Sequence, residues 1–287
     1  MTRRIAFLDI DGTILDTSGA IPASTVHAIR DARANGHLVF LATGRGPTEV
    51  GSRILDIGFD GAVLGAGAYT WIGTPYSDGG WRDERLMHPD RVAEMIDVFR
   101  EVGADYMLQG REGVWTTQAG LDRLCARLAS EGRLTDSLRE VLMDRVTIDA
   151  DPPLDRIAKA TFASEQYGTY GAVKARLGDE FMVITGTMPG LGTAGGEVSV
   201  AGVTKGAALL LVVTELGLDA ADSIAIGDNN NDLEMLRTAG VGIAMGNATP
   251  EALAAADETT AHVDRDGIWA AFERHGLVSG DGVPPRS

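Results

Sequence analysis

Three short stretches of the sequence combine glycine with acidic, hydroxyl, amide or basic side chains. They are Asp9-Ile10-Asp11-Gly12-Thr13, Thr43-Gly44-Arg45 and Gly227-Asp228-Asn229-Asn230-Asn231-Asp232. Asp9 and Asp11 are separated by one residue, so on an extended backbone both carboxylates start on the same face. Two carboxylates this close repel each other strongly unless a proton or a cation separates them. The pattern therefore predicts a site in which carboxylates work together with a positive charge.

The donor types in these stretches favour one kind of metal ion. Asp228 would add a third carboxylate, and three carboxylates with backbone oxygens suit a hard divalent cation that keeps several waters. None of the five histidines lies in these stretches, and the single cysteine, Cys125, has no second cysteine beside it. The sequence therefore predicts Mg²⁺ as the cofactor and disfavours a zinc site.

Each of the three stretches directly follows a short apolar run that is typical of a buried strand. These runs are Ile5 to Leu8, Leu38 to Ala42 and Ile224 to Ile226, and further strands are predicted over Ala62 to Leu64 and Val241 to Ala244. Helices are predicted between them, at about 24–35, 205–216 and 231–238, and one that begins at Pro250 after Thr249 as N-cap. Strands that alternate with helices favour a parallel sheet, in which ligands bind beyond the carboxyl ends of the strands.

The middle of the chain has a different pattern, which predicts an inserted domain. Residues 73–83 and 186–196 are rich in glycine and polar residues, and both are expected to cross between domains. Between them, amphipathic helices at about 90–102 and 121–131 alternate with strand-like runs such as 146–148 and 181–184. We predict an α/β fold: a Rossmann-like parallel-sheet core (1–84 and 198–287) with an inserted α+β cap domain (85–197).

Amino-acid composition and net charge limit the kinds of molecule that the protein is expected to bind. The 287 residues carry a formal net charge of −16 and a pI near 4.6, a field that repels phosphate backbones and anionic lipid. The longest apolar run, Ala207 to Val213, is too short to span a bilayer, and the start of the chain lacks a signal-peptide pattern. A single cysteine favours a reducing compartment. We therefore expect a cytoplasmic protein that binds a small molecule, with no nucleic acid or membrane as partner.

Together with Lys205-Gly206, the three stretches resemble the four ordered motifs of the haloacid dehalogenase-like (HAD) superfamily of hydrolases. Two further stretches, Val203-Thr204-Lys205-Gly206 and Gly242-Ile243-Ala244-Met245-Gly246-Asn247-Ala248, are similar to its Cof-type sugar-phosphatase branch. The resemblance spans residues 9 to 248, and the long segment between the second and third motifs fits the large cap of that branch. One departure is Ala66-Gly67-Ala68, where the branch usually has Asn-Gly-Ala.

The resemblance implies a two-step phosphoryl transfer. Asp9 would attack phosphorus to form an aspartyl phosphate, and Asp11 would serve as general acid and base. Mg²⁺ would be held by the carboxylate of Asp9, the backbone carbonyl of Asp11 and Asp228. Thr43 and Lys205 would complete the catalytic set by binding phosphate oxygens.

The resemblance also assigns supporting roles. Gly12 and Gly44 would let the backbone approach the substrate phosphate, and Arg45 and Asn231 would contact the substrate. Asp232 would be an outer-shell partner of the metal, although an acidic residue in a first helical turn also stabilises the helix dipole without chemistry. Arg45 alternatively pairs with a carboxylate.

The expected activity is Mg²⁺-dependent hydrolysis of small phosphomonoesters, with sugar phosphates as the substrate class. Two alternatives stay open. The first is a phosphotransferase or sugar-phosphate mutase on the same scaffold, in which the aspartyl phosphate passes to a sugar hydroxyl. The second is a non-catalytic module that senses phosphate or metal.

Overall fold

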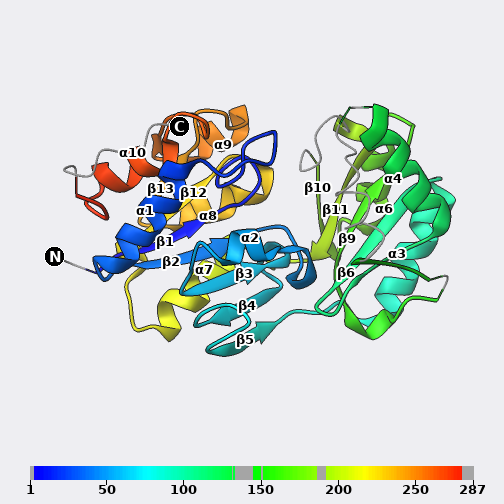
Figure 1. The fold of residues 1–287 in the computed structure, drawn as a ribbon. Coiled ribbons are helices and arrows are strands. Elements are labelled where there is room, and N and C mark those ends of the chain that lie inside the picture. The colour runs from blue at the N-terminus through cyan, green and yellow to red at the C-terminus, as the bar shows by residue number, and fades with distance from the viewer. Residues whose placement is uncertain (1–2, 131, 133–144, 150, 186–191, 280–287) are drawn as a thin grey trace. The chain divides into compact units, whose positions relative to one another are not determined.

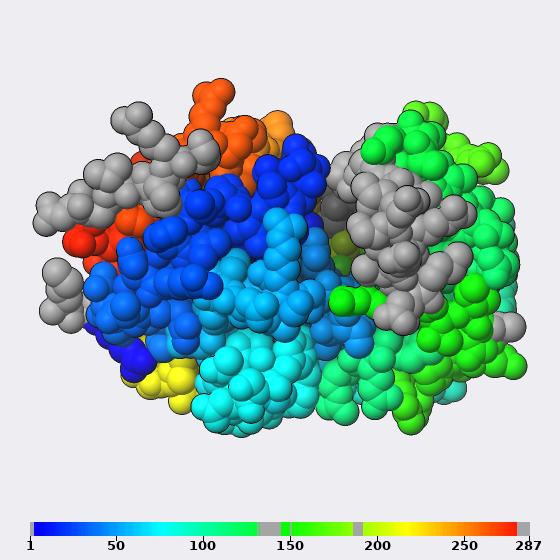
Figure 2. Space-filling view, in the orientation of Figure 1, coloured from blue at the N-terminus to red at the C-terminus, as the bar shows by residue number. Residues whose placement is uncertain are grey.

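The structure is a computed structural model that describes residues 3–130, 132, 145–149, 151–185 and 192–279. These residues divide into two compact units. The first takes its residues from Met1–Gly44, Val50–Glu84 and Val203–Ser287, and the second from Arg45–Glu49 and Arg85–Gly202. The first unit is thus built from both ends of the chain. Figure 2 shows this directly, because blue atoms from the start of the chain pack against orange atoms from its end.

The first unit contains an eight-stranded sheet in the order β14-β13-β12-β1-β2-β3-β4-β5 (Figure 1). All neighbours from β14 to β3 pair in parallel, whereas β3–β4 and β4–β5 pair antiparallel. The strands are β1 (Ile5–Leu8), β2 (Leu38–Ala42), β3 (Gly61–Leu64), β4 (Tyr69–Ile72), β5 (Gly80–Glu84), β12 (Ser223–Gly227), β13 (Val241–Ala244) and β14 (Glu258–Thr259). The predicted α/β class with a parallel core sheet is confirmed.

Helices cover this sheet because its central strands are apolar along their whole length. Every residue of β1, β3 and β12 is buried, as expected for parallel strands with both faces covered. The helices are α1 (Ala23–Ala34), α2 (Ser52–Leu55), α7 (Lys205–Glu215), α8 (Leu233–Thr238), α9 (Pro250–Ala255) and α10 (Gly267–Arg274). Apolar side chains of α7, α8 and α9 form one core with β1, β2 and β12, while α1 packs against α10 and β2. Thr249 caps α9 ahead of Pro250, as predicted.

The expected domain crossing over residues 73–83 is wrong. Strands β4 and β5 pair as an antiparallel hairpin within the first sheet, and the glycines belong to its turn. A Cβ on Gly79 would lie 1.9 Å from the carbonyl oxygen of Ile72, and the φ of Gly79 is +101°. Glycine is therefore required at position 79 to close the hairpin. The glycine-rich stretch does not form a linker. Of the second expected crossing, residues 186–191 lie outside the described residues.

The second unit contains a six-stranded sheet in the order β10-β11-β9-β6-β7-β8, antiparallel except for the β7–β8 pair. Its elements include α3 (Pro89–Glu101), β6 (Asp105–Gly110), β7 (Val114–Thr116), α4 (Gln118–Ser130), β8 (Val146–Ile148), β9 (Ile157–Ala163), α6 (Thr169–Leu177), β10 (Phe181–Ile184) and β11 (Gly195–Val200). Helices α3 and α6 share a core with β6, β9 and β10.

Strand β11 crosses the predicted boundary at residue 198. Val198 pairs with Ala160 of β9, and Val200 with Phe181 of β10, so this sheet continues to residue 200. Among the described residues, none of the helices has the length and apolar character needed to cross a membrane.

Candidate active site

The carboxyl ends of β1 and β12 bring two predicted acidic residues to one edge of the first sheet. Leu8 lies opposite Ile226 in the parallel register, and the backbone N–H of Asp9 donates to the carbonyl of Ile226 at 3.0 Å. Asp9 directly follows β1, and Asp228 directly follows β12. Although they are far apart in sequence, both side chains are buried, with 4% and 8% of their surface exposed.

Lys205 joins this edge from the start of α7. Thr204 caps the helix by accepting a hydrogen bond from the N–H of Ala207, which fixes where the helix begins. The side chain of Lys205 is fully buried. Its Nζ donates to Asp9 Oδ1 at 2.5 Å and to Asp232 Oδ1 at 2.6 Å. A single ammonium group therefore bridges two carboxylates from separate parts of the chain.

Asp232 uses both of its oxygens within the protein. While Oδ1 binds Lys205, Oδ2 accepts the backbone N–H groups of Asp228 and Asn229, each at 3.0 Å. A Cβ on Gly227 would lie 2.5 Å from the carboxyl carbon of Asp232, so glycine is needed there for this approach. Asp232 thus fixes the backbone that presents Asp228.

Asp228 in turn packs against the loop that follows β1. Its Oδ1 accepts a hydrogen bond from Thr13 Oγ1 at 3.1 Å. A Cβ on Gly12 would lie 2.2 Å from Asp228 Oδ2, and the φ of Gly12 is +91°. Gly12 is therefore doubly constrained, by its backbone conformation and by the carboxylate beside it.

The cluster holds more negative charge than Lys205 balances. Burial raises the pKa of Asp9 well above its ordinary value; Lys205 opposes this shift, and Asp232, Asp228 and Asp11 add to it. Burial, followed by repulsion from Asp232, raises the pKa of Asp228 to about 7. Burial alone would lower the pKa of Lys205, but Asp232 and Asp9 outweigh it and raise that pKa. A further cation would relieve this excess.

The donor set fits such a cation. One oxygen from each of Asp9, Asp228 and Asp232 lies within 4.8 Å of the others. Hard divalent ions prefer carboxylate oxygens of this kind. Since both oxygens of Asp232 already bind protein groups, Asp9 and Asp228 are the carboxylates with capacity to bind a metal directly.

The other predicted residues lie at varying depth around this cluster. Asp11 is exposed, and its charge raises the pKa of both Asp9 and Asp228. Thr43 follows β2, the strand beside β1, and is buried, with the half-buried Gly44 next to it.

Two further predicted residues, Arg45 and Asn231, have surroundings of their own. Arg45 belongs to the second unit, where its Nη1 donates to the carbonyl of Glu49 at 3.5 Å. Asn231 is half-buried in the 3₁₀ turn Asn230–Asp232. Its Oδ1 is buried and accepts no hydrogen bond within the part of the chain that the structure describes.

Sequence reasoning gave no role to Thr13 and Asn247, which the structure brings to the site. Thr13 binds Asp228, and Asn247 Nδ2 donates to the carbonyl of Gly12 at 2.7 Å. Both residues lie within motifs that the sequence analysis identified. Their position in these motifs is the one sequence feature that could have indicated a role at the site.

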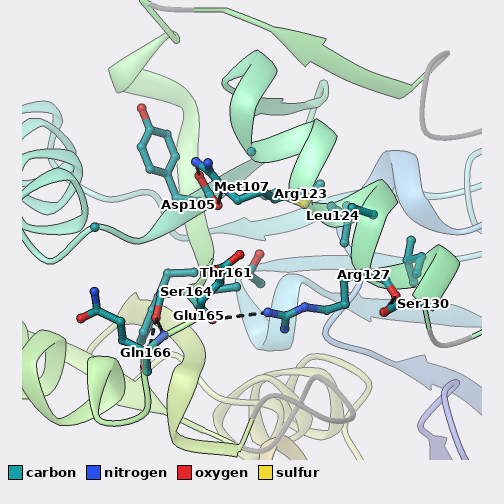
Figure 3. Close-up of a pocket in the computed structure, with 17 residues that line it drawn as sticks. Asp105, Met107, Arg123, Leu124, Arg127, Ser130, Thr161, Ser164, Glu165 and Gln166 are labelled. Carbon is teal, nitrogen blue, oxygen red and sulfur yellow. Dashed lines mark hydrogen bonds and ion pairs between the residues drawn. The ribbon is translucent and has the colours of Figure 1, made fainter.

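The second unit has a pocket of its own, of ≈ 720 Å³, between α4 and the end of β9 (Figure 3). Arg123 forms an ion pair with Asp105 at its wall, and Arg127 Nη2 donates to the carbonyl of Ser164 at 3.3 Å. None of the predicted site residues is among those that line it.

Comparison with known proteins identifies the family of the chain. Residues 6–272 match the model of the haloacid dehalogenase-like hydrolase family. The chain is 26% identical over 277 residues to the 5-amino-6-(5-phospho-D-ribitylamino)uracil phosphatase YcsE of Bacillus subtilis (strain 168), covering 96% of both proteins. It is 25% identical over 272 residues to a phosphoglycolate phosphatase of Methanothermobacter thermautotrophicus, covering 94% of this chain and 98% of that protein.

A solved structure shares the whole fold. The HAD subclass IIB sugar phosphatase BT4131 superimposes with a TM-score of 0.76 at 22% identity, covering 96% of this chain and 100% of that chain. The fold is thus a Rossmann-like α/β core with a second unit inserted in the chain. The chain belongs to the haloacid dehalogenase-like hydrolase family, and it is a phosphatase of that family.

Proposed function

We propose that this phosphatase hydrolyses small phosphorylated metabolites, with sugar phosphates as the substrate class, through an aspartyl phosphate on Asp9. The observation that carries the proposal is the buried bridge from Lys205 to Asp9 and Asp232, with Asp228 beside it. It holds a carboxylate at a strand end where ligands of parallel α/β sheets bind. The relatives support small phosphorylated metabolites as substrates: one acts on a phosphoribityl compound, which favours sugar phosphates, and another on phosphoglycolate, a phosphorylated hydroxy acid.

In the first step, an oxygen of Asp9 attacks phosphorus and the bond from phosphorus to the leaving oxygen breaks. Asp11 donates a proton to that oxygen, so the product leaves as an alcohol. In the second step, Asp11 takes a proton from water, whose oxygen attacks the phosphorus. The Asp9–phosphate bond then breaks, which releases inorganic phosphate and restores the carboxylate.

The remaining residues of the first unit bind phosphate oxygens or the metal ion in this proposal. Lys205 directs Asp9 and offers its ammonium group to one phosphate oxygen, and Thr43 offers a hydroxyl to another. Asp9, Asp228 and the backbone carbonyl of Asp11 would hold Mg²⁺, with Asp232 as an outer partner. When bound, Mg²⁺ supplies the positive charge that screens the nucleophile from the phosphate.

The second unit is assigned the role of a cap that selects the leaving group. It is inserted in the chain between the second and third motifs and has its own sheet and core. We propose residues 1–84 and 198–287 as the core and residues 85–197 as the cap. Strand β11 extends the cap sheet past this boundary, to Val200. Arg45, which groups with this unit, is assigned to substrate binding together with Gly12, Gly44 and Asn231.

Phosphate release from a panel of sugar phosphates and other phosphomonoesters tests the proposal. The wild type and Asp9→Asn are compared with Mg²⁺ and with EDTA. We expect Mg²⁺-dependent release that Asp9→Asn lowers by on the order of 10³-fold or more, while the variant stays folded. Near-normal activity of Asp9→Asn would refute the nucleophile. Transfer of the phosphoryl group to an added sugar, without release, would point to a phosphotransferase or mutase.

A further inference from the structure

The segment from Met245 to Thr249 lies directly against the catalytic strand ends. The backbone N–H of Met245 donates to the carbonyl of Gly227 at 3.0 Å, and that of Thr249 to the carbonyl of Asp228 at 2.9 Å. The segment therefore follows the backbone that presents Asp228. It is also the stretch of the sequence to which the proposed chemistry gives no task.

Asn247 extends this contact from Asp228 to the loop after β1. Its Nδ2 donates to the carbonyl oxygen of Gly12 at 2.7 Å, and its Oδ1 accepts the backbone N–H of Val263 at 3.0 Å. Val263 is buried. Since one end of the amide has an acceptor and the other a donor, the orientation of the side chain is fixed, and the Gly12 carbonyl is held by an anchored group.

Gly12 is a position where such a hold matters. Glycine has little intrinsic preference between backbone conformations, and here its φ is +91°. The N–H of Gly12 donates to the carbonyl of Leu15 at 2.8 Å, so Asn247 secures the second side of the residue. Because a peptide unit is planar, fixing the Gly12 carbonyl also fixes the N–H of Thr13.

We infer that Asn247 is a positioning residue of the catalytic loop: by binding the Gly12 carbonyl it keeps Asp11 and Thr13 in register with Asp228. The inference rests on the proposed function, in which Asp11 gives its proton to the leaving group. Without the bond, the peptide between Gly12 and Thr13 keeps only the long hydrogen bond from the N–H of Thr13 to the carbonyl of Ile10, at 3.4 Å, and is less firmly held. Asp11, the residue before Gly12 and exposed, then loses its defined position.

The leaving group supplies a measurement that a purely structural role would not move. A 4-nitrophenyl leaving group departs without a proton, whereas a sugar hydroxyl needs a general acid, which contributes about 10²–10⁴-fold. We expect Asn247→Ala and Asn247→Asp to lower kcat/KM, which reports the step that expels the leaving group, at least about 10-fold more for a sugar phosphate than for 4-nitrophenyl phosphate. Asn247→Asp keeps an acceptor for Val263 and loses the donor, and its agreement with Asn247→Ala excludes an effect of added charge.

Asn35→Asp is a matched control in the same unit. Asn35 Nδ2 also donates to a backbone carbonyl, that of Leu277, at 2.9 Å. We expect this variant to keep the kcat/KM of the wild type on both substrates. In the background of Asp11→Ala, Asn247→Ala is expected to cause no further loss with the sugar phosphate, since both changes remove the same contribution.

The outcomes separate the inference from the proposed function. If Asp11→Ala loses more activity with the sugar phosphate but the Asn247 variants lose both substrates equally, or no more than Asn35→Asp, the positioning role is refuted and the proposed function stands. If Asp11→Ala itself shows no dependence on the leaving group, the acid role of Asp11 is refuted and the inference with it.

Discussion

Each of the two units buries a lysine against carboxylate groups, but the charge balance of the two sites differs. In the second unit, Lys159 Nζ pairs with Glu197 Oε2 at 2.6 Å, with side chains 3% and 8% exposed, on neighbouring strands β9 and β11. In the first unit, Lys205 contacts Asp9 and Asp232, and Asp228 lies beside them. The ion pair of Lys159 with Glu197 matches one positive with one negative charge, whereas one lysine among three carboxylates leaves an excess that a cation or proton has to offset.

Of the changes that test this comparison, removal of the bridging lysine is expected to have the largest effect. We expect Lys205→Met to lower kcat by on the order of 10²–10³-fold, because Asp9 loses its partner and the phosphate loses a cation. Phosphate release measures this. Lys174→Met is the control, since the ammonium group of Lys174 is exposed and binds only the hydroxyl of Tyr170 among the hydrogen bonds that the described residues show. Equal activity of both variants would contradict a catalytic role for Lys205.

Breaking the pair in the second unit is expected to affect stability instead. Glu197→Gln leaves the ammonium group of Lys159 buried without its carboxylate, which costs about 3 kcal/mol of unfolding free energy. Denaturant unfolding measures the loss. The double variant Lys159→Met/Glu197→Leu removes both charges and is expected to recover most of that loss. If Glu197→Gln unfolds like the wild type, the pair does not have the energetic role assigned here.

The excess charge of the first unit predicts a pH dependence with a definite sign. The pKa of Asp228 is raised to about 7 in the folded protein, from 3.8. Its contribution to stability is therefore complete below about pH 4 and is lost as the pH rises toward 7, by up to about 1.4 kcal/mol per pH unit. Unfolding in EDTA at pH 5 and pH 8 measures this slope, and Asp228→Asn is expected to flatten it.

Magnesium is expected to reverse this loss, because a metal binds the ionised carboxylates. Added Mg²⁺ therefore stabilises the protein more at pH 8 than at pH 5, and Asp228→Asn removes the difference. An equal effect of Mg²⁺ at both pH values would contradict a metal site built on Asp228.

The smallest expected effect concerns the hydroxyl that binds Asp228. Thr13→Val removes a hydrogen bond that lowers the pKa of this carboxyl, so the pKa rises further. The expected loss of Mg²⁺-binding free energy is about 1–2 kcal/mol, which corresponds to a roughly 5- to 30-fold weaker affinity. Calorimetric titration with Mg²⁺ measures this affinity. Thr214→Val, which removes an exposed hydroxyl bonded to the Leu210 carbonyl, serves as the control and is expected to leave the affinity unchanged.

The sequence alone determined where the strands and helices of the first unit lie along the chain, because the signals for them are local. A buried parallel strand is apolar along its length, as Ile5 to Leu8 shows, and the polar residues that follow it have to lie at the ligand-binding edge. Capping chemistry is equally local, so Thr249 and Pro250 identified the start of α9. Glycines are ambiguous by contrast: Gly73 and Gly79 suggested a linker and instead close a hairpin.

Only the tertiary structure decided how the acidic residues share one lysine. Asp9 and Lys205 are separated by 196 residues and meet because helix α7 packs in one core with β1, β2 and β12, an arrangement that the local sequence does not specify. The commitment of both Asp232 oxygens, the contact of Gly12 with Asp228 and the bond from Asn247 to Gly12 arise in the same way. The sequence shows which residue types are present in these motifs. It does not show their hydrogen-bond partners or pKa shifts, because these depend on burial and distance, which long-range packing sets.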